Sequence, residues 1–226
     1  MRDLGKVVLH IPAREGSKRV KRKNLRDMNG KPMISYVIEA ALEAGVTENC
    51  YVNTDDEGII EYVKQNYPKM QIYLRAKELC NDQAKSDDFN SDIIRKLNAD
   101  TLIMINPVCP LIEASDIKNV YEAYLNSDCD TMITSCSTHM QTFCNGQPVN
   151  IKTTEELQPS QDNPLITTLN WAVTIWDGKK FLERMASKGF GVWGDKMEFF
   201  DIEPLKSTKV SYEQDFITCE KLLKIR

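Results

Sequence analysis

The chain has 226 residues, of which 42% are hydrophobic and 27% are charged, and its formal net charge is -4. This composition is that of one compact domain with a sizeable core, and it excludes a disordered or fibrous chain. The acidic balance argues against a general nucleic-acid or membrane-surface binder, because such partners select a net basic protein, so any anion site has to be local.

The first half of the chain alternates short apolar runs with segments of helical periodicity. The β-branched run from Val7 to Ile11 predicts a buried strand that ends at Pro12, and a basic polar loop follows. Pro32 opens a helix that closes at Gly45. Further strands are predicted at 50–53, 71–74, 101–105 and 131–136, and further helices at 57–65, 86–97 and 115–125.

Three features complete this pattern. Ser115 stands where it would cap the helix that it opens. An apolar strand is predicted at 170–176, and an amphipathic helix at 212–223 would return Phe216, Ile217, Leu222 and Leu223 to the sheet. The alternation predicts a doubly wound three-layer α/β sandwich with a mostly parallel sheet and ligands at the carboxyl ends of its strands.

Residues 139–160 interrupt the alternation. This segment is rich in Gln, Asn, Thr and Pro and has little periodicity. Loops of this length inside compact domains are usually functional, so we expect a lid or an interface arm inserted into a single domain that covers residues 1–226.

The cellular setting is expected to be the cytoplasm. No apolar stretch is long enough to span a bilayer, and the first residues lack the apolar region of a signal peptide. Seven widely spread cysteines without a CxxC pair predict free, mostly buried thiols rather than a structural zinc site. We therefore expect neither nucleic acid nor a membrane as a partner.

The loop from Ile11 to Asn24 gathers positive charge between the first strand and the first helix. Backbone amides and cations converge at such a place, which favours a phosphate group. Gly16 and Ser17 would add close backbone approach and a hydroxyl donor. Neither GxGxxG nor GxxxxGK with a following Ser or Thr is present, which disfavours Rossmann dehydrogenases and P-loop kinases; the alternative is a solvated basic loop. The basic residues are Arg14, Lys18, Arg19, Lys21, Arg22 and Lys23.

The same loop resembles the opening signature of the cytidylyltransferases that activate acidic sugars, namely the synthetases of CMP-sialate, CMP-Kdo, CMP-legionaminate and CMP-pseudaminate. That signature reads Ile-Pro-Ala-Arg-x-Gly-Ser-Lys and ends in Lys-Asn, as here. The resemblance implies a nucleotidyltransferase that couples CTP to an acidic sugar, with magnesium as cofactor. It implies that Arg14, Lys18 and Lys23 are the catalytic cations, and that Ala13, Gly16, Ser17 and Asn24 bind the nucleotide.

Later segments are also similar to this family. Residues 74–86 match a nucleotide-binding segment in which Arg75, Asp82 and Ser86 hold the family's places, although an exposed ion pair is the alternative for Arg75. Asn106 stands where the family's Gln-Pro-Thr-Ser-Pro-Leu loop has its first residue, and the resemblance implies that it faces the substrates. Gln161 matches the family's Arg-x-Gln-x-x-Pro element.

The acceptor end departs from the family pattern at one position. Asn170 and Trp171 occupy the first two places of the family's Asn-Gly-Ala turn, which borders the sugar pocket. A bulky indole in place of glycine would either reshape the acceptor site or pack under a loop. Both interpretations remain open from the sequence.

The segment before Asp215 departs more strongly from the family pattern. Counting back from Asp215, Lys209 and Ser211 stand where the family has the Asp-x-Asp pair that helps to hold magnesium. A charged lysine has no acceptor to offer to a metal ion. Either the triphosphate holds the ion with Asp215 or another carboxylate, or Lys209 replaces part of the ion's electrostatic role, or the chain is catalytically impaired.

The favoured mechanism is in-line attack of a sugar hydroxyl on the α-phosphorus of CTP, with pyrophosphate as the leaving group. The alternatives are another acceptor, such as a sugar phosphate, polyol phosphate or phosphonate, and a non-catalytic nucleotide-binding homologue. Residues 139–160 resemble the arm that family members exchange in homodimers. His10 lies within the first strand and is expected to be a core residue.

Overall fold

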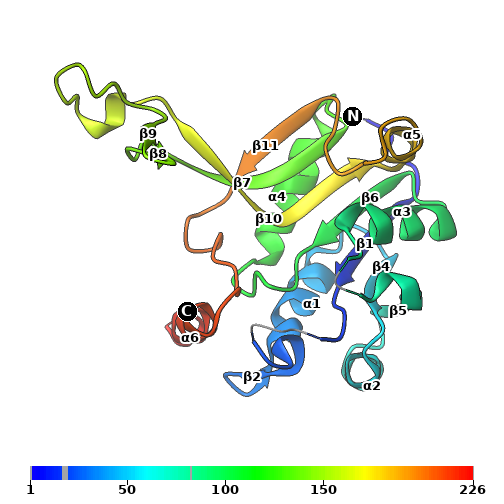
Figure 1. Ribbon diagram of the computed structural model, residues 1–226. Helices are drawn as coiled ribbons and strands as arrows, with labels where there is room; N and C mark the ends of the chain where they lie inside the picture. The colour runs from blue at the N-terminus through cyan, green and yellow to red at the C-terminus, as the bar shows by residue number, and fades with distance from the viewer. Residues whose placement is uncertain (1, 17–19, 82, 226) are drawn as a thin grey trace.

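The computed structural model describes residues 2–16, 20–81 and 83–225. Its centre is a seven-stranded sheet (Figure 1). The strands of this sheet are β1 (Val7–Pro12), β4 (Cys50–Thr54), β5 (Gln71–Leu74), β6 (Thr101–Ile105), β7 (Thr131–Thr138), β10 (Ile166–Asp177) and β11 (Met197–Asp201).

The strand order is β11-β7-β10-β6-β1-β4-β5. Within the described part of this seven-stranded sheet, β10 alone runs antiparallel to its neighbours, β6 and β7, and every other pairing in the sheet is parallel. The predicted mostly parallel α/β sheet is therefore confirmed. Because β1, β4 and β5 run in one direction, the loops that follow them gather at one edge of the sheet.

Helices cover both faces of the sheet (Figure 1). One face carries α1, α2 and α4, whose apolar side chains pack with Leu9, Val52 and Ile103. The other face carries α3 and α5, which pack with Val8 and Leu102. The helices are α1 (Met33–Ala44), α2 (Glu57–Asn66), α3 (Ser86–Leu97), α4 (Ala114–Leu125), α5 (Gly178–Lys188) and α6 (Glu213–Lys224).

Local signals explain where several of these elements begin and end. The strand β1 is buried from Val7 to Ile11, as its β-branched run predicts. The helix α1 ends at Gly45, which has a φ of 60°, a conformation that glycine adopts at little cost. The helix α2 begins after Asp56, whose carboxylate accepts hydrogen bonds from the first turn.

Two sequence predictions about the helices were wrong. Ser115 does not cap α4, because the helix begins one residue earlier and Glu113 is its N-cap; the backbone N–H of Glu113 donates to the Asp116 carboxylate. The helix α6 does not return to the seven-stranded sheet. Its buried face, with Phe216 and Cys219, packs instead in a separate cluster that includes Met33.

The segment that follows β7 projects from the body of the molecule (Figure 1). The strands β7 and β10 pair up to Thr138 and Ile166, and the chain between them forms the hairpin β8 (Phe143–Cys144) and β9 (Gln147–Pro148).

The described helices are all too short or too polar to cross a membrane. A second small ribbon, β2 (Asp27–Met28) with β3 (Lys31–Pro32), leads into α1.

Candidate active site

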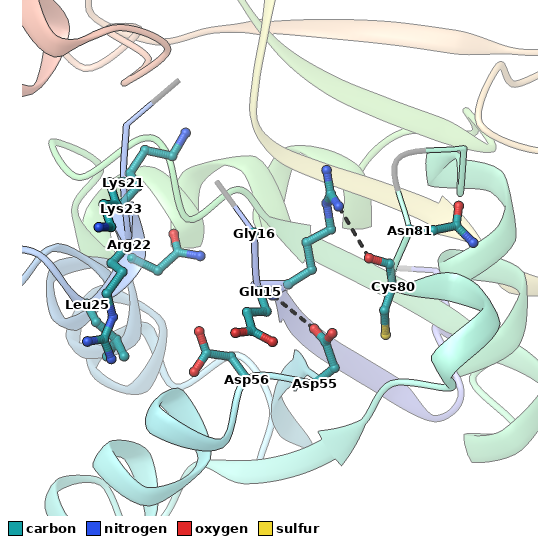
Figure 2. A pocket seen from close by; sticks show the side chains of 12 residues that line it. Glu15, Gly16, Lys21, Arg22, Lys23, Leu25, Asp55, Asp56, Cys80 and Asn81 are labelled. Carbon is teal, nitrogen blue, oxygen red and sulfur yellow. Dashed lines mark hydrogen bonds between the residues drawn. The ribbon is translucent and has the colours of Figure 1, made fainter. Parts of the chain in front are cut away.

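A cleft of about 580 Å³ opens beside the basic loop, at the carboxyl ends of β1 and β4 (Figure 2). Lys21, Arg22 and Lys23 lie on one side of it, and Cys80 and Asn81 lie on the other. The remaining lining residues are Arg14, Glu15, Gly16, Asn24, Leu25, Asp55 and Asp56. The structure therefore brings together six residues that the sequence singled out, which are Arg14, Gly16, Lys21, Arg22, Lys23 and Asn24.

The backbone of the basic loop turns into this cleft at two positions. Gly16 has a φ of 87°, and the place where a Cβ would stand is open to at least 4 Å. Arg22 has a φ of 49° and precedes the short 3-10 turn of Lys23–Leu25. Positive φ at Gly16 costs little and leaves the main chain bare, so that a ligand can approach its amides.

Asn24 is the most informative residue of the cleft. Its side chain is only 8% exposed, and its Oδ1 accepts no hydrogen bond within the described part of the chain. A buried acceptor without a donor costs about 1–3 kcal/mol, so such groups normally find a partner in the functional state. Asn24 therefore fits a ligand that brings an N–H or O–H donor into the cleft.

Lys23 reaches from the cleft towards the C-terminal segment. Its ammonium group donates a 2.7 Å hydrogen bond to the main-chain oxygen of Val210. Val210 is itself tied to the loop after β6, because its N–H donates to the main-chain oxygen of Val108 at 2.8 Å. The lysine thus joins the basic loop to the segment in which Lys209 lies.

Carboxylates form the floor of the cleft. Asp55 accepts a 2.9 Å hydrogen bond from the backbone N–H of Glu15, and Asp56 caps α2. Sequence reasoning missed Asp55, Asp56 and Cys80. The signal was available, because these residues follow β4 and β5 as the basic loop follows β1, and the ends of parallel strands meet at one edge.

Arg75 does not line this cleft and is only 4% exposed. Its Nε and Nη2 donate to the side-chain and main-chain oxygens of Asn53, and its guanidinium carbon lies 4.7 Å from the centre of the Phe89 ring. Burial lowers the pKa of Arg75, against the opposing effects of Cys80 and Asp55. The alternative of an exposed ion pair is wrong, since the arginine is buried.

The other described residues that were predicted to bind the nucleotide do not line the cleft. Ala13 is buried and donates its N–H to Asn53, and the Ser86 hydroxyl accepts a hydrogen bond from Asn90 at the start of α3. Asn106 follows β6 and donates its N–H to Ala172. Three predicted residues lie outside the described part of the chain: Ser17, Lys18 and Asp82.

The predicted acceptor residues do not line this cleft. Asn170 is buried and accepts from the Thr134 hydroxyl at 2.6 Å, while its amide donates to Ser207. Trp171 has a φ of 58°, in a strand bulge where a glycine would be unstrained, and its ring packs edge-to-face on Trp193 at 5.3 Å. Gln161 is exposed on the projecting segment.

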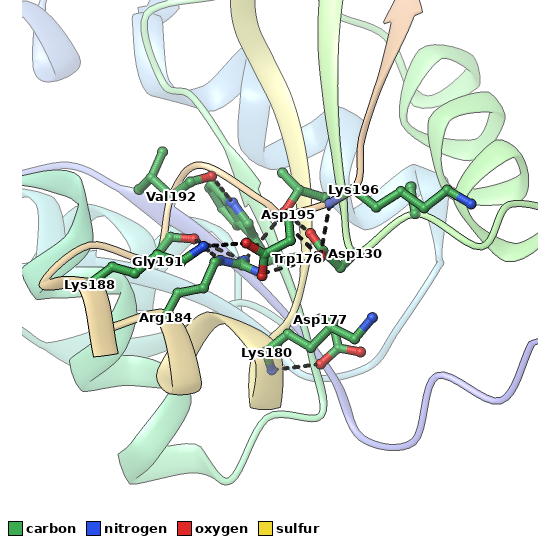
Figure 3. A network of polar contacts seen from close by, with 12 residues as sticks. Asp130, Trp176, Asp177, Lys180, Arg184, Lys188, Gly191, Val192, Asp195 and Lys196 are labelled. Atoms are coloured by element: carbon green, nitrogen blue, oxygen red, sulfur yellow. Dashed lines mark hydrogen bonds and ion pairs between the residues drawn. The ribbon is translucent and has the colours of Figure 1, made fainter. Parts of the chain in front are cut away.

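A buried ion pair fixes the loop that carries Trp193 (Figure 3). Arg184 and Asp130 are each 2% exposed and are 3.3 Å apart. Arg184 also donates to the main-chain oxygen of Gly191 at 3.0 Å, and the Trp176 indole donates to that of Val192 at 2.9 Å. These contacts hold residues 191–196 against β7 and α5.

The carboxylate of Asp215 is engaged at the start of α6. Its Oδ2 accepts hydrogen bonds from the backbone N–H groups of Ser211 and Tyr212, both at 2.8 Å. Among the described residues, no three His, Cys, Asp or Glu side chains are grouped so as to hold a metal ion. The residues present thus do not form a magnesium cage, and a metal role for Asp215 stays a prediction.

His10 is a buried core residue, as expected. Burial and the nearby Arg75 guanidinium lower its pKa to about 3, against an opposing effect of Asn90. The imidazole is therefore neutral at physiological pH.

The amino-acid sequence is similar to those of known cytidylyltransferases. A family model described as Cytidylyltransferase matches residues 8–191. The chain is 38% identical over 122 residues to a pseudaminic acid cytidylyltransferase from Campylobacter jejuni, which covers 52% of each chain. It is 32% identical over 131 residues to an N-acylneuraminate cytidylyltransferase from Streptococcus agalactiae, covering 57% of this chain and 31% of that protein. The chain thus spans about half the length of the Campylobacter relative and less of the Streptococcus one.

Solved structures agree on the fold. A CMP:2-keto-3-deoxy-manno-octonic acid synthetase complexed with CTP superposes with a TM-score of 0.68 at 18% identity, covering 98% of this chain and 99% of that one. A 4-diphosphocytidyl-2C-methyl-D-erythritol synthase from Anaerococcus prevotii gives 0.68 at 13% identity, covering 97% and 96%.

Proposed function

The chain belongs to the cytidylyltransferase family, and we propose that it transfers the cytidylyl group of CTP to an acidic sugar of the nonulosonate or Kdo class. The observation that carries this proposal is the cleft itself. It combines the open backbone of Gly16, a cluster of cations and the amide oxygen of Asn24, which has no hydrogen-bond partner among the described residues, at the carboxyl ends of β1 and β4. A triphosphate and a base with N–H donors supply what these groups lack.

In the proposed reaction, a sugar hydroxyl attacks the α-phosphorus of CTP in line. The new P–O bond forms as the bond to pyrophosphate breaks, and negative charge develops on the phosphoryl oxygens. Arg14 and Lys23 are the described cations that we assign to this charge, together with Lys18. The Asn24 amide oxygen is assigned to an amino group of the base, and Arg75 to a carbonyl group of the base.

We propose that magnesium enters with the triphosphate, whose charge it reduces when bound. The described carboxylates offer no three-ligand group, and Asp215 already caps α6, so no protein residue is assigned to the ion here. The steps above depend only on positioning and on the chain's own cations.

The acceptor end is proposed to lie near Asn106, Asn170 and Trp171, beyond the carboxyl end of β6. Gln161 lies in the short turn Ser160–Asp162 of the projecting segment, which stands away from the body of the molecule (Figure 1), and it does not line the cleft. We therefore propose a homodimer in which this segment reaches the partner's acceptor end, in a cytoplasmic protein.

The proposal is tested by incubating the protein with CTP, magnesium and a panel of acidic sugars while pyrophosphate release is followed. Turnover with an acidic sugar is the expected result. Turnover only with a sugar phosphate, a polyol phosphate or a phosphonate would assign a different acceptor. CTP binding without turnover on any acceptor would instead favour a regulatory homologue. That alternative is considered because Lys209 and Ser211 stand where the family has its Asp pair.

A further inference from the structure

Asn53 holds the guanidinium group of Arg75 at two points. Its Oδ1 accepts from Nε at 2.8 Å, and its main-chain oxygen accepts from Nη2 at 3.0 Å. No described residue accepts from the other three N–H groups of Arg75, whose pose therefore depends on Asn53 and on the ring of Phe89. A charged group held in this way loses few orientations when a ligand binds.

The main-chain oxygen of Asn53 also accepts a 2.9 Å hydrogen bond from the N–H of Ala13, at the start of the basic loop. One residue at the end of β4 thus positions both the loop and Arg75. The neighbours of Arg75 connect it to the cleft, since Arg14 donates to the main-chain oxygen of Cys80 at 3.3 Å and both residues line that cleft.

The orientation of the Asn53 amide is fixed from the other side by His10. Since Oδ1 accepts from Arg75, Nδ2 is the atom that faces Nδ1 of His10, at 3.4 Å. A neutral imidazole can accept there, whereas a protonated one cannot. Both side chains are fully buried, so no water competes for these groups.

We propose that Asn53 is a positioning residue for nucleotide recognition, acting through Arg75, and that His10 fixes the amide of Asn53 in the orientation which this requires. The inference rests on the proposed binding of CTP in the cleft. It goes beyond that function because neither Asn53 nor His10 lines the cleft.

The test is a double-mutant cycle on the full chain, with binding of CTP and of inorganic triphosphate measured by calorimetry. Asn53→Ala keeps the main-chain oxygen and removes only the side-chain contact. We expect roughly tenfold weaker CTP binding, the loss typical of one hydrogen bond to a charged group, and triphosphate binding within about twofold of the wild type. In an Arg75→Ala background, Asn53→Ala should change CTP binding no further.

Two further variants test whether weaker CTP binding comes from the lost contact between Asn53 and Arg75. Asn53→Asp keeps an oxygen for Arg75 and should recover most of the CTP affinity. Asn150→Ala is the matched control, because Asn150 is an equally buried asparagine with three hydrogen bonds in the projecting segment, and it should bind CTP as the wild type does. If Asn53→Ala does not fold, His10→Phe makes the same test by removing the acceptor for the amide.

The inference is overturned if the folded variant binds CTP as tightly as the wild type, if CTP and triphosphate weaken equally, or if the effects of Asn53→Ala and Arg75→Ala add. A wild-type chain that binds no CTP would be a different failure, since it contradicts the proposed function itself and removes the basis of the inference with it.

Discussion

The ammonium group of Lys23 lies 2.7 Å from the main-chain oxygen of Val210, although 187 positions separate the two residues in sequence. This hydrogen bond joins the basic loop to the segment that leads into α6. The residue beside Val210 is Lys209, and the electrostatic effects of both Lys23 and Lys209 act on the buried Cys109 thiol. The basic loop and the segment that contains Lys209 are therefore neighbours in space.

Lys23→Ala should abolish cytidylyl transfer while leaving the fold intact. Loss of one preorganised cation at the developing charge typically costs a factor of about 10² to 10³ in rate. Pyrophosphate release measures the effect, and circular dichroism checks the fold. Lys69→Ala is the control, because Lys69 is an exposed lysine outside the cleft. Near-normal pyrophosphate release by Lys23→Ala would contradict the cradle assignment.

Removal of divalent cations with EDTA should stop pyrophosphate release, and added magnesium should restore it. The physical reason is the negative charge of the triphosphate, which the protein's own cations balance only in part. Full activity in EDTA would mean that Lys209 has displaced the ion. A Lys209→Ala variant tests this second possibility. If the lysine replaces the metal ion, the wild type is active in EDTA and the variant is not.

His10 should make the stability of the fold depend on pH. Its pKa is lowered to about 3 in the native state, whereas an unfolded histidine has a pKa of about 6.5. Between these values the unfolded state binds the extra proton, so stability is fully present above pH 6.5 and falls as the pH falls towards 3.

Urea denaturation of the wild type and of His10→Phe at pH 7 and pH 5 measures this effect. The wild type should lose about 2 kcal/mol more than His10→Phe over this interval, because one proton contributes about 1.4 kcal/mol per pH unit below the unfolded pKa. Subtracting the change in the free energy of unfolding of His10→Phe from that of the wild type cancels the titration of groups that both proteins share. Parallel losses in the two proteins would contradict the low pKa of His10.

The elements that sequence alone predicted are those with strong local signals. The strands β1 and β6 are apolar runs buried on both faces, and α3 spans 86–97 as predicted. The helix α5 was missed because it is polar on average, although Asp177 caps its first turn. The strand β11 was missed because it is an edge strand with no buried residue, and two acidic residues interrupt its apolar pattern. Periodicity also cannot name a partner, which is why the docking of α6 on Met33 was not foreseen.

The candidate site divides in the same way. The places of Gly16 and Lys23 could be predicted because the basic loop directly follows a strand, and such loops face ligands, whereas Asn24 was assigned from the resemblance to the family signature. The burial of Arg75 could not be predicted, since it depends on Asn53 in a neighbouring strand. The positive φ at Trp171 was equally hidden, because no local signal marks a left-handed tryptophan.

Asp130→Ala should destabilise the fold strongly. It leaves Arg184 without its buried partner and with only the exposed Asp195 carboxylate, 3.8 Å away, and removing one member of a buried ion pair costs about 3–5 kcal/mol. Urea denaturation measures the free energy of unfolding. Asp128→Ala is the matched control two positions away, because Asp128 is exposed and its ion pair with Lys196 lies in solvent, so stability should barely change. Equal stability of the two variants would show that Asp130 does not anchor the loop of Trp193.

The projecting segment should form a dimer interface at micromolar concentration. Three of its apolar side chains are more than half exposed: Met140, Phe143 and Leu157. Exposed apolar side chains that gather on one segment mark an interaction surface. Light scattering should give twice the chain mass for the wild type and the single mass for Phe143→Asp with Leu157→Asp. Because Gln161 lies on this segment, that double variant should also lose transfer to the acceptor while its cleft still binds CTP. Ile225→Asp, which changes an exposed isoleucine elsewhere, should stay dimeric and active; a monomeric wild type would contradict the exchange of the segment.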